Sequence, residues 1–561
     1  MYWWHKAAKD LAAGGIGRFG FITTNSISQV FQRRIIEKAL SDSERPISIQ
    51  YVIPDHPWVD AADGADVRIA MTVAGPGREA GLLQRIVSEQ KGHGNERDIV
   101  LAEQQGVVNA SLRIGADVSS ATALAANARI CSPGVQLYGA GFIVDDTTAA
   151  ALRASAQSDA ARNVIKPYLN GRDFMARSRN AWVIDFFGLE MPEARSLHPE
   201  AFQRVVDYVK PERDLNRRDS IRGNWWRFGW ERPVWRAAAK GLARYVSTPE
   251  VAKHRVFAFL DQEVLPDNML INAAIEDAAM LGIFSSRVHV AWALAAGGRL
   301  GVGNDPRYNK TRCFETFPFP APDGPEKERI RQLAEELDAL RKARQAEHSG
   351  LTMTGMYNVL EKLRQGEPLS AKDRQIHEQG LVSVLGQLHD ELDTAVFAAY
   401  GWDDMAPRLV GHPGGTTPLP DKPSDQAEAE EELLTRLVAL NRERAAEEAR
   451  GQIRWLRPDF QAPGVAPPPG DAGVTPATGT AGSLPARGIQ ARVPWPKTLP
   501  EQFQALRSAL AEHTARGGPA TAEELAQVFT RAPRAKVAEL LATLATLGHA
   551  RRLPDGRFTP G

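Results

Sequence analysis

The stretch Gly17-Arg18-Phe19-Gly20-Phe21-Ile22-Thr23-Thr24-Asn25-Ser26 is an apolar run that polar residues close. Such a run predicts a buried strand, and its polar carboxyl end predicts a ligand-binding edge if the strand lies in an open parallel sheet. A helix and two further strands are expected at residues 27–39, 47–53 and 67–73. The segment between these two strands, residues 54–66, is rich in turn-forming residues. This order predicts an α/β unit over residues 1–77.

Length, charge and cysteine content limit the class of protein. A chain of 561 residues is too long for one core and predicts several domains. Lys+Arg and Asp+Glu both number 68, so net charge indicates no partner and only local charge is informative. Two cysteines exclude a disulfide framework and a four-thiolate zinc site, and they fit a reducing compartment. No apolar run of about 18 residues and no signal pattern is present, so we expect a cytoplasmic protein with no membrane partner.

Composition and periodicity divide the middle of the chain. Residues 78–322 mix short strands, helices and aromatics, which predicts an α+β domain. Residues 323–456 are expected to be helical, because apolar residues recur there at helical spacing. The first such set is Ile330, Leu333, Leu337 and Leu340. Residues 457–496 are rich in Pro, Gly, Ala and Thr, a composition that predicts a linker.

The last segment, residues 497–561, has the pattern of three helices and a hairpin. Thr521 and Glu524 form a capping-box pattern, and Asp555-Gly556 is typical of a hairpin tip. This order predicts a winged helix. Its candidate recognition helix and wing carry basic residues, namely Arg534, Lys536, Arg551, Arg552 and Arg557. Binding in the DNA major groove and docking to another protein both remain open, since a fold does not fix a function.

Residues 201–256 form the most basic part of the chain. They carry 13 Lys or Arg against 6 Asp or Glu, a local charge of +7. The basic residues are interleaved with the aromatics Trp225, Trp226, Phe228, Trp230 and Trp235. Because basic side chains neutralise phosphates, we expect DNA contacts here. The candidates are Arg217, Arg218, Arg222 and Arg227. The alternative is a solvated charged face.

Several motifs together carry a family resemblance. They are the sequences RFGFITTNSISQ at 18–29, DHPW at 55–58 and VRIAMTV at 67–73, and the segments 164–173, 180–185, 253–255 and 308–320. These resemble adenine-N6 DNA methyltransferases of type IIG restriction and phage-defence (DISARM-like) proteins, over about residues 1–405. The resemblance implies a remnant of a Rossmann-like methyltransferase domain followed by a target-recognition domain. The helical region and the winged helix complete the expected fold.

The resemblance also implies roles for single residues. Trp58 is at the position of the aromatic that stacks on the extruded adenine in this family. Asn25 is at the strand edge that borders the adenine and cofactor pocket. Structural alternatives are a turn Trp and helix capping by Asn25 or Ser26. In the target-recognition domain, the resemblance adds Lys253, Arg255, Lys310 and Arg312 as candidate DNA contacts.

Two family elements precede these motifs and are absent here, the loop that binds S-adenosylmethionine and an Asn-Pro-Pro-aromatic motif. We therefore expect the C-terminal portion of a site-specific adenine methyltransferase, inactive alone and binding no S-adenosylmethionine by itself. Its partners would be double-stranded DNA and the N-terminal half or other defence subunits. The alternative is a non-catalytic specificity subunit or a split partner. The acidic cluster near His389 is expected to be a charged helix face, so no metal site is expected.

Overall fold

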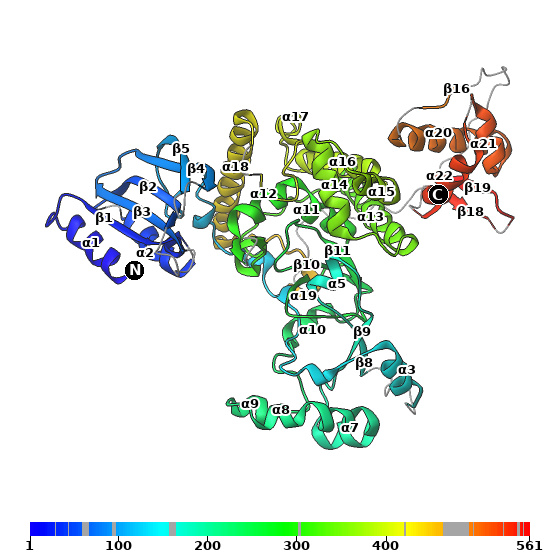
Figure 1. Cartoon of the computed structure of the whole chain (residues 1–561), viewed down its shortest axis with the longest axis horizontal. Coiled ribbons are helices and arrows are strands. Elements are labelled where there is room, and N and C mark those ends of the chain that lie inside the picture. Colours follow the sequence, from blue (N-terminus) through cyan, green and yellow to red (C-terminus); the bar gives the residue numbers. More distant parts are fainter. Residues whose placement is uncertain are drawn as a thin grey trace.

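The computed structural model in Figure 1 describes most of the chain. The described residues are 1–28, 30–42, 44–58, 67–91, 97–155, 164–300, 305–419, 422–463, 493–496, 499–530, 532–546, 550–553 and 555–560. Figure 1 shows a sheet-containing N-terminal unit, a central group of helices, a mixed unit that extends away from these helices, and a small C-terminal unit.

The N-terminal unit is a five-stranded sheet with helices packed against it. The strands are β1 (Phe19–Thr24), β2 (Ile47–Trp58), β3 (Val67–Pro76), β4 (Gly81–Lys91) and β5 (Arg97–Gly106), in the order β1-β3-β2-β4-β5. β2 and β4 pair in parallel, whereas the other neighbours are antiparallel. Helices α1 (Tyr2–Ala12) and α2 (Val30–Leu40) contact each other and the sheet. Trp4, Ile36 and Val52 are buried in the core between them.

The structure corrects the expectation of a parallel strand buried on both faces. β1 lies at the edge of the sheet, and its only partner among the described residues is β3, with which it pairs antiparallel. Its side chains alternate between the core and solvent, so that Phe19 is buried while Ile22 is 59% exposed. An apolar run is buried on both faces only where two layers cover it, and the described helices cover the Phe19 face.

Other boundaries of this unit also differ from expectation. The helix expected from residue 27 begins at Val30, because the 3₁₀ turn η1 (Asn25–Ser28) comes first. β2 continues to Trp58 after a register shift between Ile53 and His56, so residues 54–58 form a strand instead of a turn. The sheet also continues past residue 77 through β4 and β5. The domain boundary expected there therefore falls between two strands of one sheet.

The mixed unit contains two four-stranded sheets. One has the order β11-β10-β13-β6 and the other β12-β8-β9-β7. Their strands are β6 (Cys131–Pro133), β7 (Ile143–Val144), β8 (Ile165–Leu169), β9 (Ala181–Ile184), β10 (Arg244–Pro249), β11 (Ala258–Asp261), β12 (Leu265–Pro266) and β13 (Leu270–Ala273). The helices are α3 (Asp146–Ser155), α5 (Gly171–Met175), α6 (Met191–Leu197), α7 (Pro199–Tyr208), α8 (Lys210–Asp214), α9 (Asp219–Gly223) and α10 (Pro233–Ala239).

The helical region follows the mixed unit in the chain, and within it the hairpin β14 (Gly298–Leu300) and β15 (Asp305–Arg307) and the π-turn η5 (Lys310–Phe314) come between the second and third helices. That region contains α11 (Ala278–Ser285), α12 (Arg287–Ala296), α13 (Gly324–Glu347), α14 (Met353–Gln365), α15 (Ala371–Gly380), α16 (Val382–Ala399), α17 (Ala406–Leu409) and α18 (Ser424–Ala449). The periodic residues of α13 expected to face a core, from Ile330 to Leu340, are buried. Among the described helices, none alone is long and apolar enough to cross a membrane, and α11 with α12 meets that test only as a bent pair.

Helix α18 returns to the segment that leaves the N-terminal sheet. Asn441 Oδ1 accepts a hydrogen bond from the Thr122 amide at 3.0 Å. The Glu448 carboxylate accepts from the amides of Ala125 and Ala126 at 2.7 and 2.8 Å. These side chains satisfy amides that face no strand or helix partner, so α18 fixes the start of the mixed unit.

The expected linker is shorter than the composition indicated. Helix α19 (Pro458–Gln461) packs on the mixed unit, where Arg457 Nη1 donates to the Ala274 carbonyl at 2.7 Å. Gln461 Nε2 donates to the Ala126 carbonyl at 2.9 Å. These donors pair with backbone carbonyls of the mixed unit and its first segment, which orders the chain to residue 463. Residues 464–492 of the expected linker lie outside the described residues, and its last part, residues 493–496, is described and begins with a short strand.

The C-terminal unit has the expected order of three helices and a hairpin. It contains β16 (Val493–Pro494), α20 (Leu499–Gly517), α21 (Ala522–Val528), β17 (Phe529–Thr530), α22 (Arg534–Thr546), β18 (Ala550–Arg552) and β19 (Phe558–Pro560). The expected capping box is confirmed, because Thr521 Oγ1 accepts from the Glu524 amide and the Glu524 carboxylate accepts from the Thr521 amide. Helix α20 contacts α16, and helix α22 contacts α13.

Candidate nucleic-acid interface

The N-terminal sheet brings Asn25 and Trp58 to the same edge. β1 and β2 both run antiparallel to β3, so their carboxyl ends point the same way. Thr24 of β1 pairs with Ile69 of β3, and Trp58 of β2 pairs with Val67, which lies two residues before Ile69 on β3. Since neighbouring strands lie about 4.8 Å apart, residues on β1 and β2 at this edge lie about 10 Å apart. The side chain of Asn25 is outside the described part of the structure, so its expected role stays a prediction.

Trp58 is the last residue of β2 and is 44% exposed. An ion pair across the strands holds this end of the hairpin, with Asp55 Oδ1 and Arg68 Nε 2.7 Å apart. The indole therefore stands on a fixed strand end with part of its surface open to solvent. That arrangement suits a stacking surface, and the expectation that Trp58 stacks on a base remains a prediction.

Three of the four arginines in the first predicted group lie on α9 and in the loop between α8 and α9, at the end of the mixed unit that is far from the helical region in Figure 1. Arg217, Arg218 and Arg222 are exposed. Arg222 forms an ion pair with Asp219, and Arg218 Nη1 donates to the Tyr138 hydroxyl at 3.1 Å. Three of the four predicted arginines are therefore close together in the chain, and their side chains are exposed to solvent.

Arg227 differs from these three. Its Nη2 donates to the Leu189 carbonyl at 2.8 Å and forms an ion pair with Glu190 at 3.2 Å. The side chain is only 21% exposed. Two partners already occupy this guanidinium, so its main visible role is to hold the segment before α6.

The aromatic residues interleaved with these arginines are mostly core residues, which corrects the expectation that they support DNA contact. Trp225, Trp226, Phe228 and Trp235 are between 5% and 8% exposed. Trp230 is the exception at 51%. Sequence interleaving did not distinguish the four that fill the core from the one that faces solvent.

The second group of predicted contacts, Lys253, Arg255, Lys310 and Arg312, comes together where two segments pair. The Tyr308 amide donates to the Glu250 carbonyl at 2.7 Å, which joins these segments. Lys253 is exposed and donates to Asn358 Oδ1 at 2.6 Å. Lys310 forms an ion pair with Glu315 at 3.0 Å. Arg312 Nη1 donates to the Ala296 carbonyl at 3.2 Å.

Arg255 does not lie on a surface, and the expectation of a DNA contact is wrong for this residue. It is 2% exposed, and its Nη2 donates to the Pro306 carbonyl at 2.9 Å. Its Nη1 donates to Thr248 Oγ1 at 3.0 Å. Burial lowers the pKa of the guanidinium to about 10. Arg255 therefore cross-links β10 to the segment at β15 from the inside.

A basic loop next to this second group was missed by sequence reasoning. Arg172, Arg177 and Arg179 are exposed on α5 and the loop that follows it. Asp173 holds the loop, because it caps α5 with Asn170 and accepts from Arg179 Nη2 at 2.8 Å. The sequence Asn170-Gly171-Arg172-Asp173 has a helix-capping pattern. This pattern and the three nearby arginines together could have predicted an ordered basic loop.

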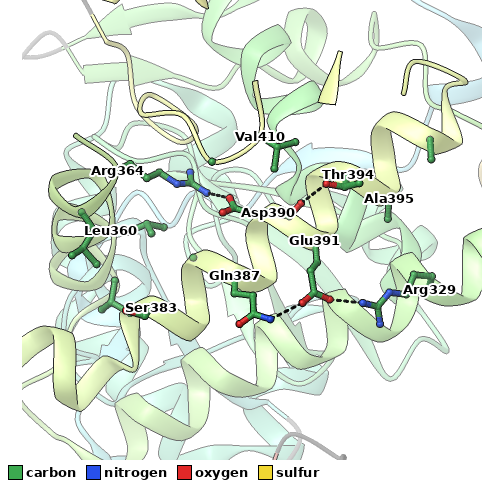
Figure 2. Close-up of a pocket in the computed structure, with 15 residues that line it drawn as sticks. Arg329, Leu360, Arg364, Ser383, Gln387, Asp390, Glu391, Thr394, Ala395 and Val410 are labelled. Carbon is green, nitrogen blue, oxygen red and sulfur yellow. Dashed lines mark hydrogen bonds and ion pairs between the residues drawn. The ribbon is translucent and has the colours of Figure 1, made fainter. Parts of the chain in front are cut away.

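The acidic cluster of α16 is a charged helix face. Figure 2 shows Arg364 Nη2 bound to Asp390 Oδ1, at 2.5 Å, in a groove along α16. Glu391 is bound to Arg329 and to Gln387 in the same view. His389 is buried and bonded to the Tyr357 hydroxyl at 2.8 Å. Within the described residues, no group of three or more His, Cys, Asp or Glu is arranged to hold a metal ion.

The basic residues of the C-terminal unit fall into two sets. Arg534, Lys536 and Arg557 pair with nearby carboxylates of Glu523, Glu539 and Asp555. Arg551 and Arg552 on β18 are exposed. Because successive residues of a strand point to opposite faces, these two exposed arginines lie on the two faces of the hairpin.

Comparison with known proteins finds a family model that matches the mixed unit together with α11, α12 and the segment to η5. Residues 119–321 match the family model described as "MmeI, target recognition domain". No curated protein matches the sequence. The family match starts after the N-terminal sheet ends, which agrees with a boundary beyond β5.

Two solved structures are similar. One is the Type IIL restriction-modification enzyme MmeI in complex with DNA, with a TM-score of 0.57 and 18% identity, over 79% of this chain and 52% of that one. This chain thus spans about half the length of that enzyme and shares its fold over the matched part. The other is the type IIG restriction endonuclease BpuSI, at 8% identity over 68% of this chain and 47% of that one. Its TM-score is 0.24, so the two structures superpose poorly. Residues 119–321 are similar to the target recognition domain of a restriction-modification enzyme.

Proposed function

We propose that this chain recognises a specific sequence in double-stranded DNA as part of a restriction-modification system. The match of residues 119–321 to a target recognition domain carries the proposal. The exposed arginines of α9 and the loop before it support the proposal, because such side chains neutralise phosphates and fix a protein's register on the duplex.

We further propose that the N-terminal sheet belongs to a methyltransferase domain that modifies adenine N6 in restriction or phage defence. The observation that favours this is the shared edge of Asn25 and Trp58 at the carboxyl ends of β1 and β2. Trp58 would stack on the adenine after it leaves the duplex. S-adenosylmethionine would supply the methyl group in the complete enzyme. The sequence has no Asn-Pro-Pro motif, so no contact to that cofactor is assigned to this chain.

The unpaired edge of β1 supports the same proposal. Among the described residues β1 has a strand partner on one side only, and Ile22 on β1 and Tyr2 and Trp3 on α1 are 59% to 68% exposed. An exposed edge of this kind is a template for a further strand. In the proposed enzyme, the segment with the methyl-donor site would continue the sheet from β1.

The alternative is a non-catalytic specificity subunit. The N-terminal sheet favours it in one respect, since Trp4, Ile36 and Val52 form a buried core without any further segment. Such a subunit would position DNA and leave the chemistry to a separate polypeptide.

The C-terminal unit could act in either arrangement. We propose a winged-helix-like module whose hairpin residues Arg551 and Arg552 contact phosphates next to the recognised site. Its helix order and the hairpin β18–β19 support this reading.

Selection from a pool of duplexes with a random core tests the main proposal. The purified full chain should enrich one short sequence, and binding should weaken steeply with salt, because phosphate contacts release counterions. Failure to enrich any sequence at low salt would overturn it. Methylation assays with S-adenosylmethionine then separate the two arrangements. We expect no methyl transfer by the chain alone in both. Transfer after fusion to a methyl-donor segment supports the enzyme, and its absence with a correctly folded fusion supports the subunit.

A further inference from the structure

A cavity of about 420 Å³ opens between α9 and α10 on the mixed unit. This volume is within the range typical of ligand pockets. Trp230 lines it, and 51% of the Trp230 surface is open to solvent. Ser220, Asn224 and Glu231 also line it. The cavity thus combines a large aromatic face with several polar side chains.

The Trp230 indole is held in place from several sides. Its backbone N–H and C=O both pair with Gln136, at 3.1 Å each. Hydrogen bonds from Trp230 and Arg218 to the Tyr138 hydroxyl lower the pKa of that group. The Arg232 guanidinium lies 5.8 Å from the Trp230 ring centroid, and its Nε donates to the Gly134 carbonyl at 2.9 Å. A ring that is already fixed loses little side-chain entropy when a ligand stacks on it.

Three polar side chains that line the cavity, those of Ser220, Asn224 and Glu231, have unused hydrogen-bonding groups among the described residues. Oε1 of Glu231 is buried, and it has no hydrogen-bond partner among the described residues. Burial raises the pKa of Glu231 although Arg227 opposes the shift. The side chains of Ser220 and Asn224 make no hydrogen bond with any described residue. An unsatisfied buried acceptor costs free energy, so a small rotation that turns the Glu231 carboxylate toward a donor on a ligand in the cavity is favoured.

We propose that this cavity receives a nucleobase of the recognised DNA, with Trp230 as the stacking surface and Glu231 as the acceptor for the exocyclic amino group of the base. The inference rests on the duplex recognition proposed above and names a site within it. Bases in a duplex present only their edges, so a base that meets the face of Trp230 has left the stack. Stacking on the aromatic ring offsets part of the cost of unstacking. Glutamate typically accepts from cytosine N4, which favours cytosine at this position.

Trp230 is linked to the arginines predicted from the sequence. Arg218, one of those arginines, shares the Tyr138 hydroxyl with Trp230. The cavity therefore opens next to the surface that is expected to hold the phosphates. A base displaced near that surface has a short path into the cavity.

The test compares variants of the full chain on the duplex that the wild-type protein selects from a random pool. Trp230→Ala should weaken binding to that duplex by about tenfold or more, as expected for loss of one stacked base. Tyr208→Ala is the matched control. Tyr208 is 60% exposed with the Arg204 guanidinium 4.6 Å from its ring centroid, and it is not among the cavity residues. Its loss should leave affinity within about twofold.

An abasic scan of the selected duplex identifies the base. Removing the base that occupies the cavity should weaken binding of the wild-type chain and leave Trp230→Ala unaffected, because the same contact is already lost. If every abasic position weakens both proteins equally, Trp230 contacts no base and the inference is overturned. If the wild-type chain selects no sequence, the proposed function itself fails, which is a different result.

A second variant tests the acceptor. Glu231→Gln replaces an acceptor-only group by one that both donates and accepts. It should relax base preference at the position identified by the scan while melting temperature and affinity for unrelated duplexes stay unchanged. Unchanged preference at that position would remove Glu231 from the site.

Discussion

Asp55 and Arg68 form an ion pair across β2 and β3, with 2.7 Å between Oδ1 and Nε. The pair lies at the carboxyl end of β2, three residues before Trp58. Both side chains are partly exposed, so the pair alone contributes little to stability. Its position matters more, because it fixes the strand end from which Trp58 projects.

Trp58 is predicted to stack on the extruded adenine in the completed enzyme. Trp58→Ala should lower methylation strongly and leave duplex affinity nearly intact, because stacking contributes about 1–3 kcal/mol per base only after the base has left the duplex. Trp58→Phe should keep much of the activity, since a smaller aromatic face remains. Methylation rate and 2-aminopurine fluorescence at the target base are the measurements. Wild-type methylation by Trp58→Ala would make this residue structural.

The arginines of α9 and of the loop before it are predicted to bind phosphates. Changing Arg217, Arg218 and Arg222 to Ala should reduce the slope of log affinity against log salt by about 2 to 3, at roughly 0.9 per phosphate contact. The control is a triple change to Ala on the helical region, at Arg329, Arg408 and Arg436, each of which pairs with a carboxylate. Filter binding over a range of salt gives both slopes. An equal slope in all three proteins would move the DNA surface elsewhere.

Arg255 is predicted to affect stability rather than DNA affinity. Arg255→Ala removes donors from buried oxygens of Thr248 and Pro306, which should lower the free energy of unfolding by about 2–5 kcal/mol. Urea denaturation measures this. Arg217→Ala should stay within about 0.5 kcal/mol of wild type, since Arg217 is exposed. A stable Arg255→Ala protein with a reduced salt slope would contradict the interior role.

Acid is predicted to weaken the junction between the mixed unit and α14. His254 is buried, and its ring nitrogens contact Thr416 Oγ1 and Asn358 Oδ1 at 3.0 Å each. Burial lowers the pKa of His254 to about 4. Between the unfolded value near 6.5 and this value, the unfolded chain binds more protons than the folded chain, so the free energy of unfolding falls as pH falls.

His254→Gln removes this group from the balance. Between pH 6 and 4.5, the slope of the free energy of unfolding should decrease by about 1.4 kcal/mol per pH unit. Urea midpoints at several pH values measure the slope. Buried His289 contributes in the same direction, since burial lowers its pKa to about 3, so a remaining slope is expected. An identical slope in His254→Gln and wild type would show that His254 does not titrate on unfolding.

Sequence patterns predicted elements with a strong local signal and failed where tertiary packing decides. The helical spacing from Ile330 to Leu340 and the Thr521 cap are local, and both are present. The exposure of Trp230 and the burial of Trp226 are not local, because the same residue type in one basic segment faces solvent or core according to which element covers it.

The same limit applies to the candidate site. Lys253 and Arg255 are two residues apart in one segment, but Lys253 is exposed to solvent whereas Arg255 is buried inside the unit. Charge count treats them alike. The family resemblance implied a role for Asn25 and a role for Trp58, but their shared edge is visible only in the structure, where β3 lies between their strands. The cavity at Trp230 depends on residues from Ser132 to Trp235, so no sequence window contains it.

The return of α18 to residues 116–126 has a consequence for protein synthesis. Thr122 finds its partner in Asn441, 319 residues later. At translation rates of roughly 5–20 residues per second, Asn441 is synthesised on the order of 15–65 s after Thr122, so the Thr122 amide lacks this hydrogen-bond acceptor during that time. The mixed unit therefore leaves the ribosome with its first segment unanchored, and an early stop before residue 441 yields a chain in which that anchor never forms. Shortened forms of this protein that end before α18 should therefore be more sensitive to proteases in the cell than the full chain.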